Sequence, residues 1–375
     1  GAGFFVTATD FSIPSGSTLS ATGMGHSGGR GGATTCGIGI GPGAVGCSNY
    51  GSPGSGYGGN GGIGESGNIS VMGPGYGSIT NPVDLGSGGA GGAGYNSGGG
   101  GGGRLKLSVS GPLTRGGASS SDGAGGQNGS AGADDDNEPG GGGSGGAINI
   151  TAATLLGSGK LTALGGSAGT GRWCAGGGGG GRIAVVVTGT DSSSLNIMGV
   201  GPGVASGNCS WALTGGVGTI ARKNPGASLY DLTLKAGATV AQAPTPMYGE
   251  TFGTVTVSGL VLTSGTASGT GFSLTAAYFS IPSGSTLSAS GMGHSGGQGG
   301  ATSSQKGNGP GGGQTTAAYR CGGGGYGGAG GSGANGGAGG GVYGSTTNPV
   351  DLGSGGAGCQ GWNEGGGGGG RIDLT

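Results

Sequence analysis

The sequence predicts an all-β fold: a repetitive parallel β-solenoid-like frame that carries long glycine-rich inserts and contains essentially no helix. Glycine accounts for 118 of the 375 residues and occurs in unbroken runs such as residues 98–103. Short β-branched segments such as residues 183–187 separate these runs, and no sustained 3.6-residue apolar period appears. Internal repeats recur along the chain, which is typical of stacked architectures.

The glycine content is compatible with other architectures, and the composition disfavours two of them. Collagen requires glycine at every third position and abundant proline, whereas this chain has unbroken glycine runs and 14 prolines. General disorder is disfavoured because charged residues make up only 7% of the chain and apolar segments interrupt the glycine tracts. We expect the inserts to order as polyglycine-II-like strands whose backbones bond to one another, with floppy loops as the alternative.

The repeats divide the chain into segments. Residues 11–29 return with one substitution at residues 279–297, and residues 81–91 return at residues 348–358. A shorter element also recurs three times: an aromatic residue, two variable residues, six glycines and an arginine that opens a strand. The predicted segments are a first glycine-rich β module (1–111), a second (112–195), a β-rich connecting segment (196–270) and a third module (271–375) that repeats the first.

The connecting segment contains much less glycine and supports the β assignment. Its short strands alternate apolar and polar residues, as at Leu232 and Leu234, or at Val255 and Val257. Leu232, Val255 and Phe279 mark equivalent points of successive repeats, at spacings within the range of stacked solenoids.

The three copies of the short element are assigned a structural role. A phosphate-binding loop needs Gly-Lys-Ser or Gly-Lys-Thr before a helix, whereas here the arginine precedes a strand. We expect each arginine to bond carbonyls of the glycine bundle, each aromatic residue to cap the bundle's end, and the three arginines to occupy equivalent positions. The arginines are Arg104, Arg182 and Arg371, and the aromatic residues are Tyr95, Trp173 and Trp362.

Six cysteines in an even set, without metal-type spacing, predict disulfides and an oxidising compartment. The expected pairs are Cys36 with Cys47, Cys174 with Cys209, and Cys321 with Cys359. Four Asn-x-Ser/Thr triplets are candidate glycosylation sites for covalent glycans, with the first two favoured because the third starts a strand. They are Asn68, Asn128, Asn149 and Asn208.

Several function classes are disfavoured by the residues present. The net charge of −1 gives a nucleic acid little to bind, and no apolar run is long enough for a membrane span. His26 and His294, the only histidines, sit in repeated glycine turns without a nucleophile, so we expect no enzyme and no cofactor. Residues 134–136 (Asp134, Asp135 and Asp136) are a weak calcium candidate that lacks EF-hand spacing, and a solvated acidic loop is preferred.

The glycine-run modules and the strands between them resemble glycine-rich repetitive cell-surface and extracellular-matrix proteins with β-solenoid frames. The chain also resembles the glycine-rich tip adhesins of phage tail fibres, in which glycine-rich motifs pack as polyglycine-II layers. The first resemblance implies an extracellular or cell-surface location and a structural role. The second implies receptor binding through loops between the glycine tracts.

The function expected from the sequence is a non-catalytic structural subunit or segment of an extracellular fibre or cell-surface coat. A surface or receptor-binding adhesin for glycans or cells is the alternative. An ice-binding protein ranks third, because regular Thr-x-Thr ladders are missing and only Thr254 and Thr256 fit one. A solenoid without a polar capping repeat leaves an adhesive terminal face, so we expect self-association into a linear assembly.

Overall fold

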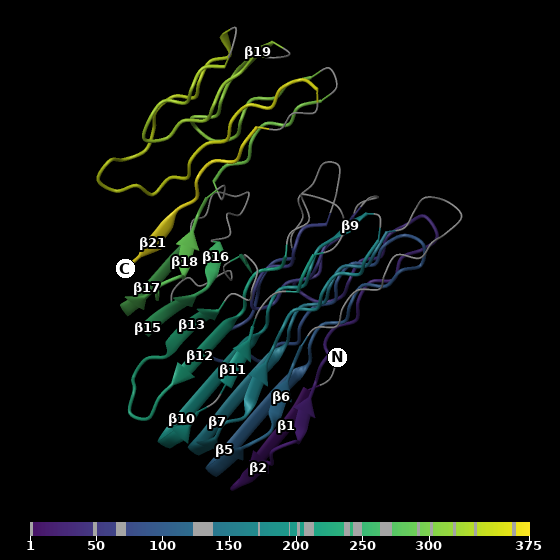
Figure 1. Cartoon of the computed structure of the whole chain (residues 1–375), viewed down its shortest axis with the longest axis vertical. Coiled ribbons are helices and arrows are strands. Elements are labelled where there is room, and N and C mark those ends of the chain that lie inside the picture. Colours follow the sequence, from purple (N-terminus) through teal and green to yellow (C-terminus); the bar gives the residue numbers. More distant parts are fainter. Residues whose placement is uncertain are drawn as a thin grey trace. The chain divides into compact units, whose positions relative to one another are not determined.

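The computed structural model confirms an all-β chain with mostly parallel strands (Figure 1). No α-helix occurs among the residues that the structure describes. These residues are 3–47, 51–64, 73–122, 138–171, 173–194, 196–200, 203–205, 214–235, 241–242, 250–262, 272–290, 293–300, 303–317, 320–333, 336–361 and 365–375.

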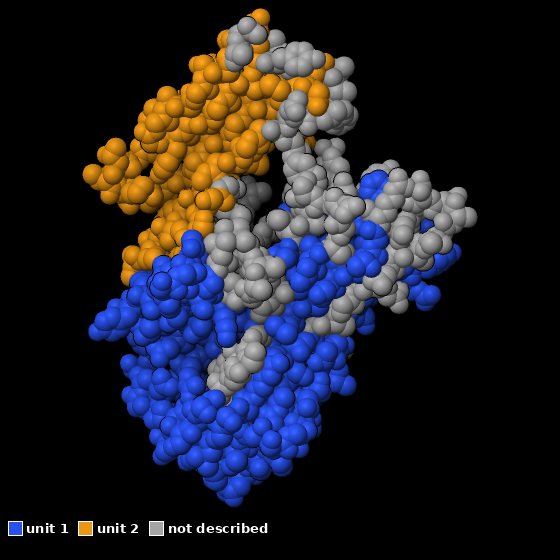
Figure 2. All heavy atoms as spheres, in the orientation of Figure 1, with its two compact units in different colours: residues 1–261, 276–286 blue, residues 262–275, 287–375 orange. Residues whose placement is uncertain are grey.

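The chain folds into two compact units, which Figure 2 colours separately. Unit 1 contains residues 1–261 and 276–286, and unit 2 contains residues 262–275 and 287–375. This division is coarser than the four segments expected from the repeats, and the boundaries of those segments remain predictions.

A long sheet of parallel strands forms the frame of unit 1. In register, Phe4 pairs with Leu105, Leu105 with Ile148, Ile148 with Ile183, and Ile183 with Ile220. Figure 1 shows the long strands lying side by side. The strands, in sheet order, are β1 (Gly3–Ala8), β5 (Arg104–Arg115), β7 (Ala147–Gly157), β10 (Arg182–Ser193) and β12 (Thr219–Lys223), and β2 (Phe11–Ile13) pairs with the far end of β5.

The strands of this sheet run in one direction up to β12 and reverse direction after it. The next strand, β13 (Asp231–Lys235), runs antiparallel to β12, and β15 (Thr251–Ser258) runs parallel to β13. Leu232 pairs with Val255, which confirms that these two residues mark equivalent points of neighbouring strands.

A second, shorter parallel sheet accompanies the long one. Each long strand is followed in sequence by a short strand: β5 by β6, β7 by β8 and β10 by β11. The two sheets share one apolar core, in which Leu107, Ile150 and Val185 from the long strands lie with Leu161 from a short strand. The short strands are β3 (Thr18–Ser20), β6 (Ala118–Ser120), β8 (Lys160–Thr162) and β11 (Asn196–Gly199).

A bulge interrupts β5 where proline enters the strand. The register between β5 and β7 shifts between Val109 and Pro112, and β10 shifts against β7 between Val187 and Thr190. Proline has no N–H for the ladder, so a central strand accommodates it at a bulge. On the other edge of β5 the same region separates the partner β1 from the partner β2.

The glycine-rich segments of unit 1 bond to one another at every third residue, and we call them the glycine bundle (residues 25–31, 37–40, 52–62, 86–91, 98–103, 141–146, 163–166, 176–181 and 214–218). In the run 98–103, the N–H groups of Gly98 and Gly101 donate to one neighbouring segment, at residues 29 and 26. Those of Gly99 and Gly102 donate to another, at Gly141 and Ser144. A three-residue spacing is that of an extended helix with three residues per turn.

The bundle is too tightly packed for side chains at many positions. A Cβ atom at Gly142 would lie 1.9 Å from the carbonyl oxygen of Gly166, and one at Gly178 would lie 2.0 Å from that of Gly143. Glycine is therefore required by the close approach of neighbouring backbones. This explains why the runs are so nearly pure.

Unit 2 repeats much of this arrangement. The parallel pair β17 (Phe272–Ser280) and β21 (Ile372–Leu374) corresponds to β1 and β5, with the first residues of β17 belonging to unit 2. Gly353 and Gly356 donate to residues 369 and 366, as Gly86 and Gly89 donate to residues 102 and 99. The remaining strands are β4 (Gly51–Ser52), β9 (Cys174–Ala175), β14 (Ala241–Gln242), β16 (Leu260–Leu262), β18 (Thr286–Ser288), β19 (Thr315–Ala317) and β20 (Arg320–Cys321).

Candidate functional site

The three arginines after the glycine runs do not share one environment. Arg104 donates to the carbonyl of Val83 at 2.9 Å, and Arg371 donates to that of Val350 at 3.2 Å, which are matching positions of the long repeat. Arg182 donates instead to the carbonyl of Tyr76. The predicted equivalence therefore describes Arg104 and Arg371 but not Arg182. The acceptors are also not glycine carbonyls, contrary to expectation.

The aromatic residues of the short element do not act alike either. Tyr95 is 62% exposed and has a positive φ of 65°, so its ring does not cap the glycine run. Trp173 is partly buried. Trp362 lies outside the described residues.

Arg182 is the centre of a buried polar cluster that the sequence did not indicate. It is fully buried, and its guanidinium donates from Nε to the Tyr76 carbonyl at 2.9 Å and from Nη1 to Thr219 Oγ1 at 3.1 Å. The guanidinium carbon lies 5.7 Å from the centre of the Tyr57 ring, a cation–π contact. Tyr57 and Tyr76 pack with ring centres 4.9 Å apart.

Burial dominates the electrostatics of this cluster. Desolvation lowers the pKa of Arg182, and Tyr57 and Glu250 oppose the shift without cancelling it. Desolvation raises the pKa of Glu250, and the charge of Arg182 opposes it. The same desolvation raises the pKa of both Tyr57 and Tyr76, which keeps the phenols neutral. The cluster thus holds one buried cation against the ring of Tyr57, with the neutral phenol of Tyr76 packed beside that ring, and its hydrogen bonds join separate segments of the chain.

The tyrosine pair recurs in unit 2, which identifies it as a repeated structural device. Tyr326 and Tyr343 have ring centres 5.1 Å apart. Tyr343 donates to the carbonyl of Leu352, as Tyr76 donates to that of Leu85. The signal was present in the sequence as tyrosines at matching positions of the two repeats, but tyrosines in glycine-rich turns carry no distinctive motif.

A second buried arginine, Arg115, stands at the turn between a long and a short strand. It is fully buried, and its Nη2 donates to Ser119 Oγ at 2.9 Å and to the Lys160 carbonyl at 3.2 Å. Desolvation lowers its pKa to about 10. The sequence did not single out this residue because it lies outside the repeated glycine element.

Two of the three expected disulfides are present among the described residues. Cys36 is bonded to Cys47 and Cys321 to Cys359. Cys174 is fully buried in β9, and its expected partner Cys209 lies outside the described residues.

The remaining candidate residues fall mostly outside the described parts of the chain. This applies to the glycosylation candidates Asn68, Asn128 and Asn208 and to the calcium candidates Asp134, Asp135 and Asp136. Asn149 is described: it is 6% exposed in β7, and its Nδ2 donates to Asn81 Oδ1 at 2.9 Å. Burial makes Asn149 a poor glycan acceptor. No group of three or more metal-ligating side chains occurs among the described residues.

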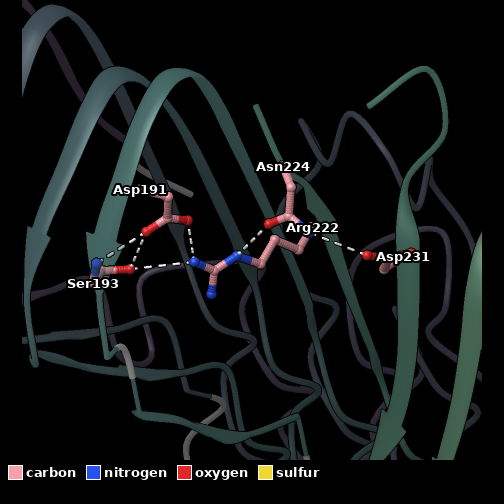
Figure 3. A network of polar contacts seen from close by, with 5 residues as sticks. All are labelled: Asp191, Ser193, Arg222, Asn224 and Asp231. Carbon is pink, nitrogen blue, oxygen red and sulfur yellow. Dashed lines mark hydrogen bonds and ion pairs between the residues drawn. The ribbon is translucent and has the colours of Figure 1, made fainter. Parts of the chain in front are cut away.

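A polar network joins the strands where the long sheet reverses direction (Figure 3). Arg222 on β12 forms an ion pair with Asp191 on β10 and donates to Ser193 Oγ at 3.2 Å and Asn224 Oδ1 at 3.1 Å. Asn224 in turn donates to Asp231 on β13 at 3.2 Å. Burial raises the pKa of Asp191, but hydrogen bonds from Ser193 and Arg222 outweigh it, so the pKa is lowered from its ordinary value of 3.8.

Replacing Asp191 by asparagine is expected to destabilise the protein in a pH-dependent way. Because the folded-state pKa is depressed, the carboxylate's contribution is present above about pH 4 and is lost as pH falls through the folded pKa. We expect a loss of about 1–2 kcal/mol at pH 7. Denaturant unfolding monitored by circular dichroism measures it, and the difference from the unsubstituted chain should shrink as the pH falls below the ordinary pKa of 3.8.

Asp373→Asn is the matched control, because Asp373 pairs with Arg371 at a more exposed site, with side chains 36% and 28% exposed. Its effect should stay below about 0.5 kcal/mol. A pH-independent loss for Asp191→Asn would contradict the assignment.

The outer face of the long sheet carries a shallow open hollow of about 470 Å³, whose lining is more apolar than polar and includes Ala8 and Val109 beside five hydroxyl-bearing residues. Thr7, Ser108 and Thr151 stand on adjacent strands in register and line it. Thr9 and Ser110 add further hydroxyls. No helix of the described residues is long and apolar enough to cross a membrane.

Comparison of the chain with protein-family models, with curated proteins and with solved structures finds no match.

Proposed function

We propose that this chain is a non-catalytic structural subunit or segment of an extracellular fibre or cell-surface coat. The observation that carries the proposal is the glycine bundle. Its segments are joined by hydrogen bonds between backbones, which makes a rigid body, and its glycines carry no side chains for a catalytic role. The same elements recur in both units, as expected of a part designed for repetition. The two disulfides support an oxidising environment.

The finer architecture belongs to the same proposal. The alternation of long and short parallel strands around one core is consistent with rungs of a β-solenoid-like frame. The three-residue hydrogen-bond spacing supports polyglycine-II-like packing of the inserts. The recurrence of the same elements along the chain supports the proposed self-association into a linear assembly.

Electron microscopy of the native material, with size-exclusion chromatography, tests the proposal. We expect fibres or a continuous coat with a regular axial repeat. A compact, stable monomer in the native material would contradict it.

An adhesin is the second candidate, and the observation that favours it is the row of hydroxyl residues Thr7, Ser108 and Thr151 along the hollow on the long sheet. Hydroxyl side chains in a regular row can exchange hydrogen bonds with the hydroxyls of a glycan. The exposed aromatic residues Phe4, Phe5, Tyr95 and Tyr278 lie on β1, a turn and β17 rather than on one loop. This distribution favours the fibre over a localised receptor site.

A further inference from the structure

Asn308 in unit 2 stands where unit 1 has Ile40. The repeat that relates residues 11–29 to residues 279–297 continues in step as far as residues 39–43 and 307–311. Ile40 donates to the carbonyl of residue 27 at 3.0 Å and accepts from residue 88 at 2.9 Å. Asn308 donates to residue 295 and accepts from residue 355, both at 3.0 Å. The two residues therefore occupy the same backbone position, and only Asn308 carries a side-chain amide.

The residue that follows this position has to be glycine. Gly309 has a φ of 93° and Gly41 has a φ of 112°, in a region that residues with side chains rarely adopt. A Cβ at Gly309 would also lie 2.4 Å from His294 Cδ2 and 2.6 Å from Ser354 Oγ. The fold thus requires glycine at residue 309, and the asparagine before it completes an Asn-Gly pair.

An Asn-Gly pair can rearrange without an enzyme or a cofactor. The backbone nitrogen of the glycine attacks Cγ of the asparagine, a bond forms between these two atoms, and the Cγ–Nδ2 bond breaks with release of ammonia. A water molecule then opens the five-membered imide at either of its two carbonyl carbons. One opening gives an ordinary aspartyl residue, and the other gives an isoaspartyl linkage in which the main chain runs through Cγ. Glycine favours the attack because it has no Cβ to hinder it.

Two Asn-Gly pairs lie in the described parts of the chain, and their environments differ. Asn60 is 3% exposed, its Oδ1 accepts from the N–H of Gly75 at 2.8 Å, and the N–H of Gly61 donates to residue 73 at 2.7 Å. Asn308 and Gly309 are both exposed, and the N–H of Gly309 donates no hydrogen bond among the described residues. The attacking nitrogen is therefore bonded in the first pair and unbonded in the second.

We propose that Asn308 is a site of spontaneous deamidation in the folded chain and that Asn60 is protected by the fold. The peptide plane between Asn308 and Gly309 is held by one hydrogen bond, from residue 355. The plane between Asn60 and Gly61 is held by two, from residue 216 and to residue 73. This plane must rotate to bring the nitrogen to Cγ, so the protected pair reacts only after local opening. The inference is independent of whether the native material is a fibre.

The isoaspartyl product is expected to loosen the glycine packing of unit 2. The linkage lengthens the main chain by one carbon, and it converts the carbonyl that accepts from residue 355 into a carboxylate outside the main chain. The hydrogen bond from Asn308 Nδ2 to Ser295 Oγ, at 2.7 Å, is lost with the ammonia. Ile40 has no amide, so the matching position of unit 1 does not undergo this change. Ageing at this position should therefore affect unit 2 alone.

Parallel incubation of the folded and the denatured full chain in mildly alkaline buffer tests the proposal, with deamidation measured by mass spectrometry. Trypsin releases residues 307–320, in which Asn308 is the only asparagine, and fragment spectra assign Asn60. In denaturant, with the disulfides reduced, both pairs should react at similar rates, since the local chemistry is the same. In the folded chain Asn60 should react at least about tenfold more slowly than Asn308. An unmodified Asn308 in the folded chain, or equal folded rates at the two residues, would overturn the proposal.

Two variants separate the reaction from its structural consequence. Asn308→Gln keeps an amide but would need a six-membered ring, so its peptide should stay unmodified under the same conditions. Freshly prepared Asn308→Asp carries the charge of one product without the isoaspartyl linkage. Faster hydrogen exchange at residue 355 in the aged chain, and not in Asn308→Asp, supports the linkage as the cause of loosening. Equal exchange in fresh and aged chains would overturn the expected loosening of unit 2.

Discussion

Gly178→Ala is expected to lower the free energy of unfolding of unit 1 by roughly 2–4 kcal/mol, although it adds one methyl group. The added carbon would lie 2.0 Å from the carbonyl oxygen of Gly143. No flexible side chain is available to move aside, because the obstacle is the neighbouring backbone. Residues 141–146 and 176–181 must separate, which stretches the hydrogen bonds from Gly142 to residue 176 and from Gly145 to residue 179. Denaturant unfolding monitored by circular dichroism measures the loss.

The glycine run of unit 2 supplies a matched control for this prediction. A Cβ at Gly365 or Gly368 would lie 2.0 or 1.9 Å from a carbonyl oxygen, whereas one at Gly366 or Gly369 would meet nothing within 4 Å. Alanine should therefore be costly at the first pair and nearly neutral at the second. A uniform cost along the run would show that the segments do not pack with a three-residue period.

Arg182→Ala is expected to cost about 3–5 kcal/mol. The substitution empties a fully buried site and leaves the carbonyl of Tyr76 without its donor. It also removes the cation beside the Tyr57 ring. Thermal and denaturant unfolding, together with near-ultraviolet circular dichroism of the tyrosines, report the loss of stability and of packing.

Variants at the matching arginines separate burial from the local motif. Arg371→Ala should cost less than about 1 kcal/mol, since Arg371 is partly exposed and pairs with an exposed Asp373. Arg182→Met should cost less than Arg182→Ala, because it fills much of the space and removes the desolvation penalty of the charge. If Arg182→Ala were no more costly than Arg371→Ala, the buried cluster around Arg182 would not stabilise the fold.

The sequence also shows how far a repeated motif predicts a repeated environment. Arg104, Arg182 and Arg371 follow identical glycine runs, yet only Arg104 and Arg371 bond matching carbonyls. The environment of each arginine depends on which module packs beside it. The sequence around the arginine does not specify that neighbouring module. The buried cluster of Tyr57, Tyr76 and Arg182 is not predictable from local sequence for the same reason, since Arg182 and Tyr76 are 106 positions apart.

The sequence by itself determined the all-β class, because β-branched segments of short length between glycine turns favour strands and no helical period competes. It also determined two disulfide pairs, Cys36 with Cys47 and Cys321 with Cys359, since neighbouring cysteines in order are close in a modular chain. Only the tertiary structure decided the pairing of long and short strands into two sheets, the reversal at β12, and which glycines are closely packed. The physical reason is that glycine has no side chain to encode a partner, so its contacts arise only when the backbones meet.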